Sequence, residues 1–150
     1  MRSLACILLF SIAFSACKKD KFTSEPQISF QKFQPDQGSN KSSLNNQPYL
    51  IFEITDSEGD LDVDTARIFI KNLLTNKLDS FNFPDLKAVR GKNFKGDVQV
   101  GLFTVMAGRN LPSTRRPFVD TLSFEVYVTD LARNKSNVII ASPFYYFTLP

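Results

Sequence analysis

The feature that most constrains the fold is a two-residue alternation of apolar and polar side chains, which recurs along nearly the whole chain after residue 26. Residues 121–129, for example, place Phe124, Val126 and Val128 on one side of an extended chain. This period is typical of antiparallel strands with one face in a core and the other in water. No segment shows the 3.6-residue period of an amphipathic helix. The pattern therefore predicts an all-β fold.

Seven strand-like runs are separated by turn signals, at residues 27–34, 48–55, 65–74, 78–83, 96–106, 121–129 and 137–149. About seven antiparallel strands without a helix predict a sandwich of two sheets. We expect a short hairpin loop at residues 75–77 and a longer crossing over residues 35–47. The alternation predicts a core that contains Ile28, Phe30, Leu50, Phe52, Ile54, Ile68, Ile70, Phe124, Val126 and Val128.

The N-terminus has the layout of a secretory signal: Arg2, an apolar run over residues 4–14, and the small pair Ser15 and Ala16 before Cys17. The run is too short to cross a hydrocarbon core, which needs roughly 20 residues of helix. Residues 14–17 resemble a lipobox, in which the cysteine thiol receives a diacylglycerol before cleavage. An ordinary signal peptide with a chance cysteine, or an uncleaved buried helix, are the alternatives. We expect a signal peptide at 1–16, a lipidated Cys17 with a tether at 17–25, and one β-sandwich domain at 26–150.

Composition excludes several function classes. The chain has no histidine, and of its two cysteines Cys6 leaves with the signal while Cys17 carries the lipid. Catalysis by Ser–His or Cys–His pairs and ordinary zinc sites are therefore not expected, and the mature chain has no intramolecular disulfide. The formal net charge of +3 falls to +2 when Arg2 is removed. This charge is too small for the strongly basic surface with which proteins bind nucleic acid.

An acidic turn between the second and third strands is the strongest local motif. It places five carboxylates within nine residues, at Asp56, Glu58, Asp60, Asp62 and Asp64. Calcium needs several oxygen ligands, and alternating carboxylates around a glycine can converge on one point. The loop is not an EF-hand, because its glycine is fourth rather than sixth and its twelfth residue is an arginine. Asp, Ser and Gly are also good formers of exposed turns, and both interpretations remain open.

A second motif follows the sixth strand, Asp130-Leu131-Ala132-Arg133-Asn134-Lys135-Ser136. Together with Asp56-Ser57-Glu58-Gly59-Asp60-Leu61 it resembles a pattern in small lipoproteins of the Bacteroidota type that carry one immunoglobulin-like domain. The match covers residues 49–61 and 126–138, and Arg133 departs from it because that family usually has glycine there. The resemblance implies an immunoglobulin-like sandwich and an envelope location, but no specific function.

In an immunoglobulin-like sandwich the loops after the second and the sixth strand emerge at the same end, so we expect Asp56 and Asp130 to approach one another. Clustered carboxylates repel unless a cation lies among them. The expected calcium ligands are Asp56, Glu58 and Asp60, completed by Asp62 and Asp130. Alternatively, Arg133 or Lys135 on the neighbouring loop neutralises the turn without a metal.

The combined features favour a non-catalytic, lipid-anchored module of the cell envelope that binds a protein or glycan partner through loops of the sandwich. A structural accessory subunit of an outer-membrane assembly and a small carboxylate-dependent hydrolase are the alternatives. Lys18 after the cysteine is compatible with sorting to the outer membrane, while the side that the domain faces stays open. The aromatic run at residues 144–147 fits either a sugar-stacking platform or a closing strand with aromatic side chains on both faces.

We predict that Cys17→Ala abolishes both lipid labelling and membrane retention, because the thiol is the acceptor of the lipid. Metabolic labelling of cells with a fatty-acid probe, followed by membrane fractionation, measures both effects. Label that persists in the variant would contradict a lipid anchor at this position.

Overall fold

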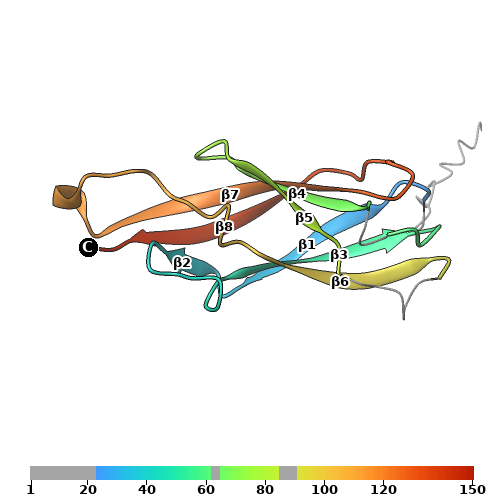
Figure 1. Ribbon diagram of the computed structural model, residues 1–150, viewed down its shortest axis with the longest axis horizontal. Helices are drawn as coiled ribbons and strands as arrows, with labels where there is room; N and C mark the ends of the chain where they lie inside the picture. Colours follow the sequence, from blue (N-terminus) through green and yellow to red (C-terminus); the bar gives the residue numbers. More distant parts are fainter. Residues whose placement is uncertain (1–22, 62–64, 85–90) are drawn as a thin grey trace, which may run out of the picture.

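The fold consists of two β-sheets packed face to face, as the alternation predicts (Figure 1). The computed structural model describes residues 23–61, 65–84 and 91–150, so the expected signal peptide, Cys17 and Asp62 lie outside the described residues. The first sheet has the antiparallel order β1-β3-β6, formed by Gln27–Gln34, Tyr49–Asp56 and Phe94–Gly101. The second has the order β2-β8-β7-β4-β5, formed by Gln37–Ser39, Ile139–Thr148, Phe118–Thr129, Arg67–Asn72 and Leu78–Asn82.

The described residues contain eight strands rather than about seven, and the additional strand is β2. It lies in the segment that we expected to be a crossing and pairs in parallel with β8 from Gln37↔Tyr145 to Ser39↔Phe147. Three residues that pair mainly through their backbone carry no alternation signal, so the sequence does not reveal them. The expected hairpin is confirmed: β4 and β5 pair antiparallel around Asn76, which has a φ of 59°.

The predicted core is confirmed at nine of its ten positions, which are all buried; Phe30 is only partly buried. Phe30 still packs against the core, and a β-bulge between Phe30 and Lys32 shifts the phase of the rest of β1. Beyond the bulge it is Phe33 that enters the core, where its ring packs edge-on against Phe124 and Phe144 at centroid distances of 5.9 and 5.2 Å. A bulge changes the face of every later residue in its strand.

The two ends of the sandwich are built from different loops (Figure 1). The described chain enters at Thr23, whose carbonyl accepts a hydrogen bond from the Ser57 N–H at 3.1 Å, at the end where β3 and β7 finish. Strand β2 and the C-terminal part of β8 lie toward the opposite end. No helix within the described ranges is long and apolar enough to span a membrane.

We predict that Phe124→Ala lowers the free energy of unfolding by about 3–5 kcal/mol, because it removes a fully buried ring from the aromatic core. Ile140→Ala on β8 is the control, since Ile140 is 53% exposed, and it should change stability by less than about 0.5 kcal/mol. Urea unfolding measures both. Similar losses in the two variants would contradict the assignment of Phe124 to the core.

Candidate functional site

The first candidate site is the acidic end of the sandwich, where the turn after β3 meets the turn after β7. Asp56 is the last residue of β3, and Asp130 directly follows β7. The two turns are joined by the backbone, because the Leu131 N–H donates to the Asp60 carbonyl at 3.2 Å. Three of the acidic residues expected as ligands, Asp56, Asp60 and Asp130, are therefore neighbours in the structure.

Asp130 organises its own turn. Its Oδ1 accepts a hydrogen bond from the Asn134 N–H at 2.7 Å, and its Oδ2 accepts one from Asn134 Nδ2 at 2.8 Å. Between them, Arg133 adopts a left-handed conformation with a φ of 68°. Glycine adopts this conformation more easily than any other residue. The turn keeps its geometry with arginine because Asp130 and Asn134 hold it on both sides.

Asp56 is the buried centre of the acidic end, with no exposed surface. Its Oδ1 accepts a hydrogen bond from the Glu58 N–H at 3.1 Å, whereas its Oδ2 has no hydrogen-bond donor. The buried Oδ1 of Asp60 also lacks a donor. Burial is the largest cause that raises the pKa of Asp56, and together with the charge and side-chain hydrogen bond of Asp60 and the charge of Asp130 it brings this pKa to about 6, against the effect of the Glu58 N–H. Among the described residues, no basic side chain forms an ion pair with these carboxyls.

The remaining residues of the sequence-based calcium hypothesis are Glu58 and Asp62. Glu58 is exposed, and Asp62 falls outside the described residues. Neither of the basic residues considered as neutralisers forms an ion pair with Asp56, Asp60 or Asp130; Lys135 instead places its Nζ 4.0 Å from the ring centroid of Tyr127. Within the described ranges, no group of three or more His, Cys, Asp or Glu side chains has the arrangement of a metal site. The calcium hypothesis is thus left with a carboxylate pair and a nearby third carboxylate.

Gly59 shapes the acidic turn and has a φ of 64°. A Cβ at this position would lie 2.2 Å from the carbonyl oxygen of Gly91, so the turn and the start of the segment leading to β6 are in close backbone contact. The Asn93 N–H donates to the Ser57 carbonyl at 2.9 Å and strengthens this contact. The acidic turn is therefore held against neighbouring backbone rather than projecting freely.

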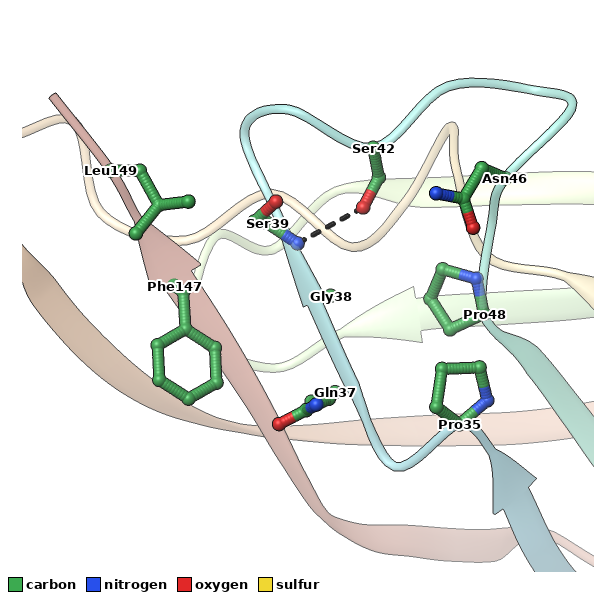
Figure 2. A pocket seen from close by; sticks show the side chains of 9 residues that line it. All are labelled: Pro35, Gln37, Gly38, Ser39, Ser42, Asn46, Pro48, Phe147 and Leu149. Atoms are coloured by element: carbon green, nitrogen blue, oxygen red, sulfur yellow. Dashed lines mark hydrogen bonds between the residues drawn. The ribbon is translucent and has the colours of Figure 1, made fainter.

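The second candidate site is a pocket of about 420 Å³ beside β2, which Figure 2 shows from close by. Its lining carries no charged side chain and consists of Pro35, Gln37, Gly38, Ser39, Ser42, Asn46, Pro48, Phe147 and Leu149. The volume lies within the range that is usual for small-ligand sites. The pocket combines flat apolar surfaces with hydroxyl and carboxamide groups.

Backbone contacts hold the walls of the pocket in place. The parallel pairing of β2 with β8 sets Gln37 and Ser39 opposite Tyr145 and Phe147. The Asn40 carboxamide continues this pairing, because it donates to the Leu149 carbonyl at 2.9 Å and accepts from the Leu149 N–H at the same distance. The loop opposite is closed by the Ser39 N–H, which donates to Ser42 Oγ at 3.1 Å (Figure 2).

Two carboxamides at the pocket have no hydrogen-bond partner in the described part of the chain, those of Gln37 and Asn46. Both lie in the segment that the sequence analysis treated as a crossing loop, so this site was missed. The aromatic run at residues 144–147 belongs to β8, with Phe144 fully buried and Phe147 at the pocket. The run is thus a strand with aromatic side chains on both faces, and one of them lines a cavity.

Comparison of the chain with known protein families, with curated proteins and with solved structures finds no match. The functional assignment therefore depends on the geometry of the two sites.

We predict that Gly59→Ala destabilises the fold by more than about 1–2 kcal/mol, which is the cost of the left-handed conformation alone, because the new Cβ also collides with the Gly91 carbonyl. Gly91→Ala is the matched control, since its Cβ would meet no atom within 4 Å. Thermal unfolding of the two variants compares them directly. If both melt at the temperature of the parent, the turn does not pack against Gly91 in this way.

Proposed function

We propose that this protein is a non-catalytic, lipid-anchored module of the cell envelope that binds a neutral carbohydrate in the pocket beside β2. The observation that carries the proposal is the lining of this pocket, which joins unpartnered carboxamides to flat apolar surfaces and contains no charge. The absence of histidine and the assignment of Cys17 to lipid support a binding role rather than catalysis.

The chemistry of the lining matches the chemistry of a sugar. Each ring hydroxyl both donates and accepts hydrogen bonds, and a carboxamide offers two donors together with an acceptor. Gln37 and Asn46 can therefore bind hydroxyls directly, without first breaking a bond within the described protein. Phe147, Pro35 and Pro48 supply the flat surfaces on which the apolar faces of a pyranose ring pack. An anionic ligand would find no opposite charge in this lining.

The strand order supports an immunoglobulin-like class for the domain. If β1, β3 and β6 correspond to strands A, B and E of that fold, they form one of its two sheets. The order β8-β7-β4 then corresponds to strands G, F and C of the other sheet, with β5 added at its edge. Domains of this class commonly bind partners through loops at one end of the sandwich.

The position of Thr23 supports an orientation in which the pocket faces away from the membrane. Thr23 contacts Ser57 at the acidic end, and five residues separate it from Cys17. Even a fully extended chain of this length spans only about 20 Å. A lipid on Cys17 would hold the acidic end close to the bilayer, while β2 and the pocket lie toward the opposite end (Figure 1). Lys18 after the cysteine is compatible with the outer membrane as the location.

We predict that the lipoprotein, purified in detergent, binds neutral oligosaccharides on a glycan array. Asn46→Ala should weaken binding of the best glycan by about 5- to 30-fold in titration calorimetry, which corresponds to the loss of one or two hydrogen bonds. Phe147→Ala should weaken it as well, because it removes the stacking surface.

Asn45→Ala is the matched control, since Asn45 lies in the same loop, is exposed and does not line the pocket. It should bind the glycan like the parent. Binding that is equally weakened by both asparagine variants, or an array that shows no neutral glycan, would contradict the proposal.

A further inference from the structure

We propose that the acidic end of the sandwich is a calcium-binding site in which the carboxylates of Asp56 and Asp60 bind the ion directly. The carboxylate of Asp130 adds negative charge beside them. This site lies toward the other end of the domain from the carbohydrate pocket, and the inference does not depend on the function proposed for that pocket.

The main observation is the buried oxygen of Asp56 that has no donor. Asp56 has no exposed surface, so water does not solvate its Oδ2, and no described group donates a hydrogen bond to it. Buried carboxylates are normally paired, hydrogen-bonded or bound to a metal, because an isolated buried charge is very costly. A second buried oxygen without a donor, Oδ1 of Asp60, belongs to the neighbouring carboxyl. These two oxygens belong to carboxyls that lie within hydrogen-bonding reach of each other, so a single positive partner, either a proton or a cation, can serve both.

The protein itself does not supply this partner among its described residues. Asp56, Asp60 and Asp130 form no ion pair with any described basic side chain, whereas Glu53 pairs with Lys95 at 2.6 Å and Asp120 with Arg109 at 3.2 Å. A shared proton could join the Asp56 and Asp60 carboxyls, but it leaves the charge of Asp130 beside them. A divalent cation compensates more of this charge at once.

The chemistry of the turn favours calcium over other cations. Calcium binds six to eight oxygen ligands in a flexible geometry, and waters can fill positions that the protein leaves open. Magnesium demands a near-ideal octahedron and gives up its waters reluctantly. The oxygens of Asp130 accept hydrogen bonds from Asn134, yet each keeps a lone pair that can face a cation. The carboxylates of Asp56 and Asp60 thus form a pair to which a third carboxylate and solvent can add.

The turn is also held in place without the ion. Ser57 bonds through its backbone to both Thr23 and Asn93, and the Asp60 carbonyl accepts from the Leu131 N–H. An ion bound by Asp56 and Asp60 would therefore link β3 to the turn that follows it. Because this turn is already held by backbone hydrogen bonds, binding would not have to order a flexible loop. The main consequence of binding should be relief of carboxylate repulsion, which appears as higher stability.

The test is a thermal melt of the full lipoprotein in detergent with about 5 mM CaCl₂, compared with a melt in chelator, together with calorimetric titration of CaCl₂. We expect the melting temperature to rise by several degrees in calcium, as it does for a ligand present at many times its dissociation constant. We also expect one bound ion per chain and a much smaller shift with MgCl₂. Asp56→Asn and Asp60→Asn keep the shape of the side chain, and each should abolish the calcium shift.

Asp97→Asn is the control, because Asp97 is an exposed carboxylate on β6, and it should retain the full calcium shift. If an asparagine variant does not fold, the calorimetric titration of the parent protein with CaCl₂ tests the proposal by itself. No heat of binding and equal melting temperatures of the parent in calcium and in chelator would overturn the proposal and assign the neutralisation of Asp56 to a shared proton. Binding that survives in both Asp56→Asn and Asp60→Asn would place the ion elsewhere.

Discussion

The packing of three phenylalanine rings between the sheets is the interaction on which the rest of the structure depends. Phe33 of β1 meets Phe124 of β7 and Phe144 of β8, which are themselves 5.8 Å apart between centroids. This cluster joins the first sheet to the two longest strands of the second, and aromatic pairs in this edge-on geometry add to the energy of their burial. The bulge after Phe30 is what allows Phe33 to reach the cluster.

The same cluster determines where the pocket lies. A Cβ on Gly38 would be 3.1 Å from the ring of Phe144 and 3.2 Å from Pro48, so glycine lets β2 lie this close to the core without a shift of these neighbours. With β2 held there, its parallel pairing with β8 places Phe147 beside Gln37 and Ser39. The pocket is therefore a direct consequence of core packing, although four of its nine lining residues have polar side chains.

The two ends of the sandwich differ in the solvent exposure of their polar groups that lack hydrogen-bond partners. At the pocket, the unpartnered carboxamides of Gln37 and Asn46 belong to exposed residues and cost little, because water replaces a missing ligand. At the acidic end, the unpartnered oxygen of Asp56 is fully buried and its charge is costly in the absence of a counter-ion. The pocket end thus presents uncharged polar groups to solvent, whereas the acidic end buries a carboxylate oxygen for which the described residues supply no donor.

The sequence by itself determined the strand composition, nine of the ten expected core positions and the presence of the acidic turn, because these depend on local alternation and on turn-forming residues. Only the tertiary structure decided that Phe33 is buried more deeply than Phe30, that Asp56 loses contact with solvent, and that β2 pairs with β8. Each of these results depends on residues far apart in the chain: Asp56 and Asp130 are brought together by two separate strands, and Phe147 reaches Gln37 only across a sheet. Alternation reports which face of a strand a residue occupies, but it contains no information about which other segment covers that face. The chemistry of both ends follows from that long-range packing.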